Sequence, residues 1–108
     1  MSAVHTPTAT SDPVGAATPL DFADRLRTLM QVCRRSPDSV ARRSRYAGTP
    51  ISRATVYNLI TAEGVPRRDS LLGFLRGCGV PARDQVRWLL AFDRIYAGGR
   101  PGALPPSR

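Results

Sequence analysis

Residues Ile51 to Ile60 read ISRATVYNLI, and winding them into a helix separates them into two faces. Val56, Leu59 and Ile60 share an apolar face that suits a protein core. The opposite face carries four residues of different chemistry, namely Arg53, Ala54, Tyr57 and Asn58. The segment is therefore either a short core helix with a solvated side or a helix that places its polar side in a DNA groove. The residues that flank it decide between the two.

Four further helices are predicted around this segment, and no stretch has the alternating β-branched pattern of a strand. A hydroxyl residue that can cap a helix begins three of the predicted helices, at Thr18, Ser36 and Ser52. Proline follows the first two caps and fits the first helical turn. Glycine and proline between the segments end the helices. The expected helices cover residues 18–33, 36–46, 52–62, 68–78 and 81–97.

The two ends of the chain have the composition of disordered tails. Residues 1–17 are mostly Thr, Ala, Ser and Pro, and residues 98–108 are rich in Gly and Pro. Between them, residues 18–97 are long enough for one small domain. We therefore expect a single all-α domain of five helices with a disordered tail at each end.

The positive charge of the chain is concentrated in one segment. The formal net charge is +8, and residues 34–68 contribute +6 of it, from eight arginines against Asp38 and Glu63. Such an asymmetry suits a polyanionic partner, of which nucleic acid is the commonest. Every basic side chain is arginine, which can bind a phosphate or a guanine edge through two hydrogen bonds. A GC-rich genome would also favour arginine over lysine, but it would not explain the clustering.

Catalysis and cofactor binding find little support in the sequence. The single histidine, His5, lies in a predicted tail, and the acidic residues are scattered without paired carboxylates or a phosphate-binding glycine loop. Cys33 and Cys78 lack metal-ligand spacing and are expected to be free, buried thiols, with a disulfide as the alternative. We expect neither enzyme activity nor a bound metal or cofactor.

The chain also lacks the segments that would direct it to a membrane. No apolar run approaches the ~20 residues that span a bilayer. The N-terminus does not have the basic-then-apolar order of a secretory signal. The sequence therefore predicts a cytoplasmic protein, associated with the nucleoid if it binds DNA.

The order of elements around residues 51–60 is that of a helix-turn-helix: a helix, a turn that contains glycine, and a helix capped by Ser52. The accompanying motifs are Val40-Ala41-Arg42-Arg43, ISRATVYNLI, Val65-Pro66, LLGFLRGCG at residues 71–79, and Trp88. Over residues 20–97 this set resembles the repressor-type (XRE/Cro-like) helix-turn-helix regulators of high-GC bacteria. The resemblance implies a lambda-repressor-like fold and a sequence-specific DNA-binding regulator of transcription.

One spacing departs from the family pattern. In that family an alanine usually stands six residues before the capping serine, whereas Ala41 and Ser52 are eleven residues apart. The five extra residues lengthen the connection and leave the angle between the two helices open. Because added loop residues cost little entropy, we still expect the helices to dock. The longer loop would carry Arg45, which becomes a candidate contact to the DNA backbone.

By similarity to the family, the polar side of residues 52–61 faces base edges in the major groove. Arg53 is the candidate for guanine, Asn58 for adenine, and the methyl group of Ala54 for a thymine methyl. The expected base-contact residues are Ser52, Arg53, Ala54, Tyr57 and Asn58. For Tyr57 and Asn58, an ordinary solvated helix face is the alternative.

Other basic and hydroxyl residues near this helix are expected to bind DNA phosphates, which fix the register without reading the sequence. The expected phosphate-contact residues are Arg42, Arg43, Arg45, Thr55, Thr61, Arg67 and Arg68. For any single arginine, a solvated charge with no partner is the alternative. Together they would form an electrostatic track along the DNA backbone.

The last predicted helix has an apolar band too wide for a simple surface helix, made of Val86, Trp88, Leu89, Leu90, Phe92, Ile95 and Tyr96. Part of this band is expected to close the core over the first and fourth helices. The rest is a candidate surface for a twofold dimer or for a partner protein. The residues expected on that surface are Leu90, Phe92, Ile95 and Tyr96.

Two rival functions remain beside DNA binding. A helix-turn-helix adaptor or antitoxin-like protein would act mainly through protein contact at the apolar band, and it would not need the +6 segment. An RNA-binding protein would use exposed aromatic platforms to stack bases, and the sequence does not provide them. The expected partner is therefore double-stranded DNA.

Overall fold

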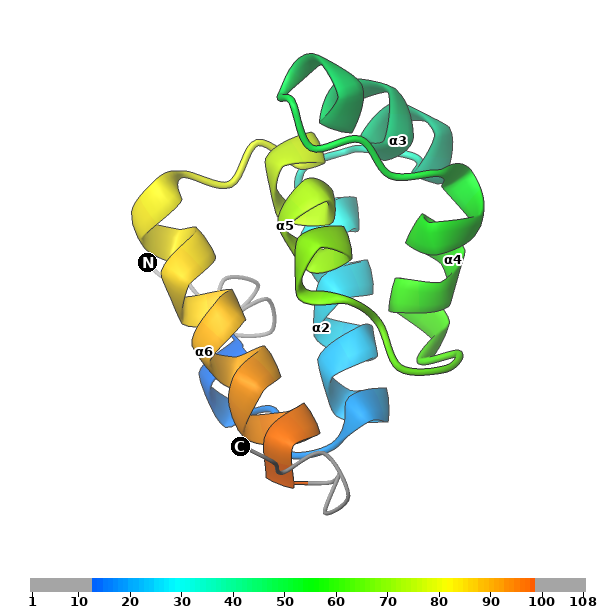
Figure 1. Cartoon of the computed structure of the whole chain (residues 1–108). Helices are drawn as coiled ribbons and strands as arrows, with labels where there is room; N and C mark the ends of the chain where they lie inside the picture. Colours follow the sequence, from blue (N-terminus) through cyan, green and yellow to red (C-terminus); the bar gives the residue numbers. More distant parts are fainter. Residues whose placement is uncertain (1–12, 99–108) are drawn as a thin grey trace, which may run out of the picture.

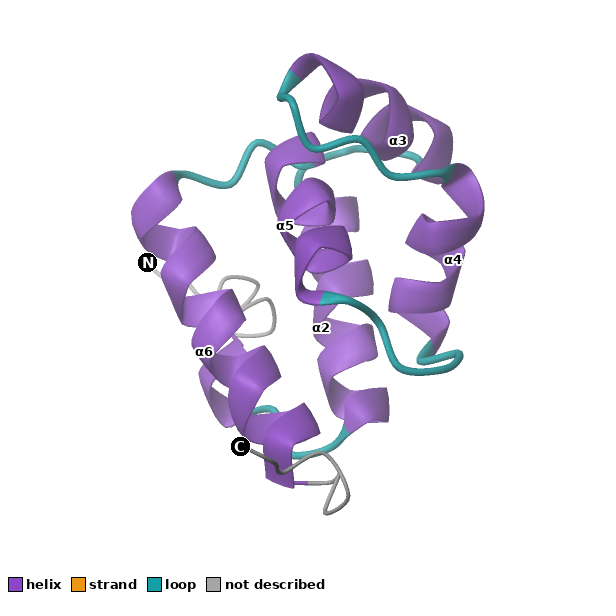
Figure 2. Cartoon of the chain, viewed as in Figure 1, coloured by secondary structure: helices purple, strands orange, loops and turns teal. Residues whose placement is uncertain are grey.

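Helices make up all the regular structure between residues 13 and 98, which is the part of the chain that the computed structural model describes (Figure 2). After a short 3-10 helix, η1 (Pro13–Gly15), come α2 (Pro19–Val32), α3 (Pro37–Tyr46), α4 (Arg53–Thr61), α5 (Arg68–Gly77) and α6 (Ala82–Gly98). The prediction of an all-α domain with five α-helices is confirmed. The predicted tails fall mainly on residues 1–12 and 99–108, which lie outside the described residues.

The helices α2, α3 and α4 each begin at a predicted capping residue. In every case the side-chain hydroxyl oxygen accepts a hydrogen bond of 3.1 Å from the amide three residues later. The capping residues are Thr18, Ser36 and Ser52. Each cap satisfies an amide that the helix itself leaves without a partner, so the starts of these helices follow directly from the sequence.

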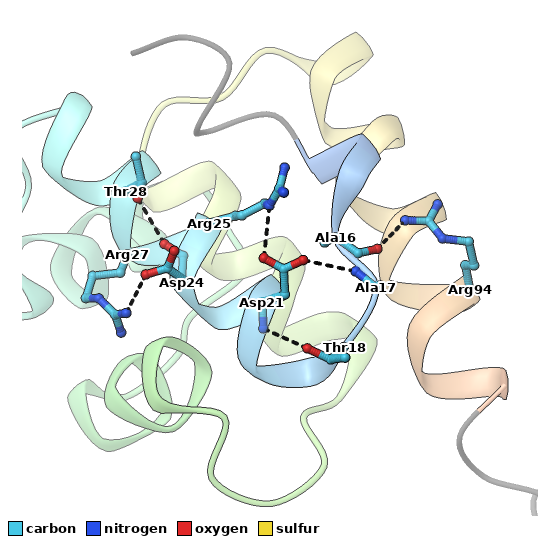
Figure 3. A network of polar contacts seen from close by, with 9 residues as sticks. All are labelled: Ala16, Ala17, Thr18, Asp21, Asp24, Arg25, Arg27, Thr28 and Arg94. Carbon is cyan, nitrogen blue, oxygen red and sulfur yellow. Dashed lines mark hydrogen bonds and ion pairs between the residues drawn. The ribbon is translucent and has the colours of Figure 1, made fainter. Parts of the chain in front are cut away.

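Residues 13–17 belong to the folded domain, although their composition predicts a tail. Ala16 is 2% exposed, and its carbonyl oxygen accepts a hydrogen bond of 2.8 Å from Nη2 of Arg94 on α6 (Figure 3). The amide of Ala17 donates to the Asp21 carboxylate at 3.2 Å. The described fold therefore extends a few residues before the expected start at residue 18. Composition does not reveal these contacts.

All five α-helices contribute side chains to one core. The ring of Phe22 on α2 lies 5.7 Å from Trp88 and 6.2 Å from Phe92, measured between centroids. The largest fully buried apolar side chains are Phe22, Leu26, Val40, Val56, Leu71, Phe74 and Leu75. The expected closure of the core by the last helix over the first and fourth predicted helices is confirmed.

Most of the apolar band of α6 is buried in this core. The predicted partner surface is therefore wrong for three of its four residues. Phe92, Ile95 and Tyr96 are 6%, 7% and 8% exposed, so they are not available to a second molecule. Phe92 and Tyr96 pack against each other with ring centroids 4.8 Å apart. Of the predicted surface only Leu90 remains exposed, at 61%, with Val86 one turn before it. The band is wide because α6 packs against three elements, α5, η1 and α2.

Figure 1 shows α4 and α6 at opposite sides of the domain, with α2 and α5 between them and α3 lying across one end. The helix α3 packs against both α5 and α4, and α4 packs against α2. This arrangement puts α4 at the edge of the domain, with one side on the core and the other toward solvent.

Candidate nucleic-acid interface

The two faces predicted for residues 51–60 are the two faces of α4. Val56, Leu59 and Ile60 are 0%, 3% and 6% exposed and contact the core. The predicted base-contact residues all lie on the exposed side: Ser52, Arg53, Ala54, Tyr57 and Asn58. Four of these five side chains can donate or accept hydrogen bonds, so the exposed side of α4 is chemically able to read base edges.

The far end of α4 is held by an arginine of α2. Nη1 of Arg27 donates to the carbonyl oxygen of Ile60 at 2.7 Å. Its Nη2 donates to the Asp24 carboxylate at 2.6 Å, a contact that Figure 3 shows. The helix then ends at Ala62, which has a left-handed backbone with φ of 60° and whose amide donates to the Asn58 carbonyl oxygen. These contacts fix the direction in which α4 leaves the body of the domain.

The longer connection between α3 and α4 runs back along α3 (Figure 1). The connection is hydrogen-bonded to Ser44, a fully buried polar residue on α3. The carbonyl oxygen of Ser44 accepts from the Thr49 amide, and its Oγ accepts from the Ile51 amide, both at 3.0 Å. The hydroxyl proton goes to the Ala41 carbonyl oxygen at 2.6 Å. The return path brings the start of α4 beside the start of α3.

Two glycines on α5 allow close packing, Gly73 against this connection and Gly77 against α3. A Cβ atom on Gly73 would stand 2.5 Å from the carbonyl oxygen of Thr49, and one on Gly77 would stand 2.5 Å from that of Val40. Arg76, between them in sequence, donates a hydrogen bond from Nη1 to Oγ1 of Thr49. Gly73, Arg76 and Gly77 belong to the LLGFLRGCG motif, but no packing role was expected for them from the sequence. The signal was the spacing of four between the glycines, which places both on one side of a helix.

The predicted position of Arg45 on an extended loop is wrong, because α3 continues through Tyr46 and includes it. The five extra residues instead lengthen α3 and form its return path. Since successive residues of a helix are about 100° apart, Arg43 and Arg45 project to opposite flanks of α3. The predicted phosphate-contact residues on this helix, Arg42, Arg43 and Arg45, therefore do not share one surface, although all three are exposed.

Arg53, the first residue of α4, is held in place by two neighbours. Its Nε lies 3.2 Å from Oδ1 of Asp38, in the first turn of α3, and its guanidinium carbon lies 5.6 Å from the centre of the Tyr57 ring. The Tyr57 side chain and then the Asp38 charge raise the pKa of Arg53. Both members of the ion pair are well exposed, at 62% and 65% of their side chains, so the pair orients Arg53 without locking it.

The remaining predicted phosphate contacts are not equivalent. Nε and Nη2 of Arg68 each donate to Asp93 on α6 at 3.1 Å, so the fork of this arginine is already occupied. Thr61 donates its hydroxyl proton to the Tyr57 carbonyl oxygen at 2.7 Å. Thr55 is only half-exposed and shares its hydroxyl with Ser52 at 3.0 Å. Of these residues, none is as open to a phosphate as its sequence position suggests.

An open depression beside α4 brings three of the predicted residues together. Its lining includes Thr55 and Asn58 from α4 and Arg67 from the start of α5, along with Glu63 and Val65 from the connection. Arg67 caps α5 without using its side chain, so its guanidinium is exposed. The structure thus places one cation next to the predicted adenine-reading residue.

The described part of the chain has neither a metal-binding cluster nor a membrane-spanning helix. Among residues 13–98, no group of three or more His, Cys, Asp or Glu side chains could hold a metal ion. None of the helices described there is long and apolar enough to cross a membrane. Cys33 and Cys78 are free thiols, as expected, but Cys33 is only half-buried. Burial raises the pKa of Cys78 to about 12, which keeps this thiol protonated and unreactive.

A helix docked on its predecessor, with one face on the core and a polar face outward, defines the class: a helix-turn-helix protein. Comparison with known families supports the same class, because the helix-turn-helix domain family matches residues 21–89. The chain belongs to this family, which supports a DNA-binding regulator and is typical of proteins that are not enzymes. No curated protein and no solved structure matches the chain.

Proposed function

We propose that the protein is a sequence-specific transcriptional regulator of the repressor-type (XRE/Cro-like) class that inserts α4 into the major groove of DNA. The observation that carries the proposal is the division of α4. Val56, Leu59 and Ile60 are at most 6% exposed, whereas Arg53, Ala54, Tyr57 and Asn58 are exposed. A helix that served only the core would not need the hydrogen-bonding side chains of Arg53, Tyr57 and Asn58 on its outer side.

In this proposal Arg53 bonds a guanine through two hydrogen bonds, and Asn58 bonds an adenine. Asp38 and Tyr57 hold the Arg53 guanidinium at the start of α4 before DNA arrives. Such pre-orientation lowers the entropy lost on binding. The methyl group of Ala54 lies against a thymine methyl, and Ser52 keeps the helix capped.

Backbone phosphates are bound by arginines that flank α4 on its two sides. Arg42 and Arg45 approach from α3, and Arg67 approaches from the start of α5. Neutralising several phosphates releases counterions, so binding weakens steeply as salt rises. In a cell, such a protein would act in the cytoplasm on the nucleoid.

Selection of double-stranded oligonucleotides from a random pool with the purified protein tests this function. We expect a short enriched motif that contains a guanine, and a palindromic motif would show that two copies bind together. Enrichment of no motif, with retention of all sequences alike, would contradict sequence-specific reading by α4.

The alternative function, an adaptor that acts through the last helix, is less favoured. Three of the four residues it required on α6 are in the core, and among residues 82–96 the exposed large apolar side chains of that helix are Val86 and Leu90.

A further inference from the structure

Three arginines from separate segments line an open depression at the end of α3 that is farther from α4. Arg35 comes from the connection between α2 and α3, Arg43 from α3, and Arg76 from the last turn of α5. Tyr46, Ala47, Gly77 and Gly79 complete the lining. We call this the arginine depression. No acidic side chain lines it, so three positive charges share one concave surface.

One nitrogen in the arginine depression lacks a partner. Nε of Arg35 is buried, and no hydrogen-bond acceptor within residues 13–98 reaches it. A buried donor without an acceptor costs free energy. Arg35 therefore contributes its charge to the depression from a partly buried position.

The arginine depression faces away from the proposed DNA-binding surface. At about 100° per residue, Arg43 and Tyr46 stand about 60° apart around α3, on one flank, whereas Arg43 and Arg45 stand about 200° apart. The start of α4 lies by the first turn of α3, where Arg53 meets Asp38. DNA bound along α4 would therefore contact the Arg45 flank and leave the Arg43 flank free.

We propose that the arginine depression binds an acidic peptide segment of another protein. Guanidinium forks bind carboxylates through paired hydrogen bonds, and arginine and tyrosine are the side chains most enriched at interface hot spots. Tyr46 supplies the aromatic surface, because it is 85% exposed on the rim. A protein that recruits others while bound to DNA needs such a second surface.

The chain itself does not supply the occupant. Outside the described residues it has one acidic residue, Asp12, against the two arginines Arg100 and Arg108. A second copy is disfavoured as well, because the net charge of +8 makes two copies repel. The complementary charge must therefore come from a different molecule.

Fluorescence anisotropy with a labelled oligoglutamate peptide tests the proposal on the full chain at physiological salt. The two test variants are Arg43→Ala and Tyr46→Ser, both at exposed positions. Arg45→Ala is the matched control, since it removes the same charge two residues away on the opposite flank. We expect saturable binding that weakens about tenfold in each test variant, and much less in the control, because exposed charges are screened beyond about 8 Å.

Three outcomes would overturn the proposal. Equal weakening by Arg43→Ala and Arg45→Ala would show that the peptide senses only the overall charge. An absence of saturable binding would remove the peptide as a ligand. Competition by a double-stranded oligonucleotide, together with loss of DNA affinity in Arg43→Ala, would assign the depression to the DNA backbone instead. Loss of helical circular dichroism in a variant would be checked first, with Tyr46→Ser as the independent second test.

Discussion

The helices α4 and α6 both carry apolar and polar residues at helical spacing, yet the structure uses them in opposite ways. On α4 a narrow apolar face of Val56, Leu59 and Ile60 docks the helix, and the rest of its surface is free. On α6 the apolar band closes around Phe22 and becomes core. A narrow apolar face leaves a helix free to contact a ligand, whereas a wide one commits it to stability.

The largest effect on stability is expected from substitutions in the buried face of α6. Truncating Phe92→Ala should reduce the free energy of unfolding by about 3–5 kcal/mol, because it empties a site packed against two aromatic rings. Leu90→Ala, two residues away and 61% exposed, should change it by less than about 0.5 kcal/mol. Urea unfolding followed by circular dichroism measures both. Equal losses of stability in the two variants would mean that Phe92 and Leu90 do not lie on a buried and an exposed face of α6.

A second effect tests how α4 is held. Replacing Gly73→Ala places a methyl group against the Thr49 carbonyl oxygen and should destabilise the domain by about 1–3 kcal/mol through overpacking. It should also lower DNA affinity, because the displaced connection carries the start of α4. Thermal unfolding and gel-shift titration would follow the two effects. An unchanged melting temperature would show that the return path can move freely.

The next effect concerns base recognition by α4. Arg53→Ala should weaken binding to the selected sequence by about ten- to hundredfold and relax the preference at one base pair. Arg83→Ala, an exposed arginine of α6, is the matched control and should leave that preference unchanged. Competition gel shifts with single-base variants of the selected sequence give the comparison. Unaltered base preference in Arg53→Ala would remove this residue from its proposed role.

The smallest expected difference separates two neighbouring arginines. Arg67→Ala should weaken binding to all sequences alike and reduce the salt slope by about one. Arg68→Ala should change the slope less, because its fork is already bonded to Asp93. The affinity of each variant over a range of salt concentrations measures the slopes. A steeper loss in Arg68→Ala would mean that the Asp93 pair opens when DNA binds.

Local signals in the sequence were enough to place the helices and the two faces of α4. Hydroxyl caps and the 3.6-residue repeat act within one turn, so Ser36 and Ser52 mark their helices without knowledge of the rest of the fold. The resemblance to repressor-type regulators pointed to the same helix-turn-helix class that the family comparison supports.

The signals that failed depend on contacts between distant parts of the chain. The burial of Ile95 and Tyr96 depends on how α6 packs, and the anchoring of Ala16 depends on Arg94, far away in sequence. The return path of the α3–α4 connection depends on Gly73 of α5. A pattern read along one element does not contain the position of its neighbours.

Mapping amide chemical-shift changes during titration with the selected DNA tests the central claim most directly, namely that the outward side of α4 is the surface that meets the bases. We expect the largest changes at residues 52–58, with smaller ones near Arg42, Arg45 and Arg67 and little change along the outward side of α6. Largest changes on α6, with residues 52–58 unperturbed at saturation, would contradict it.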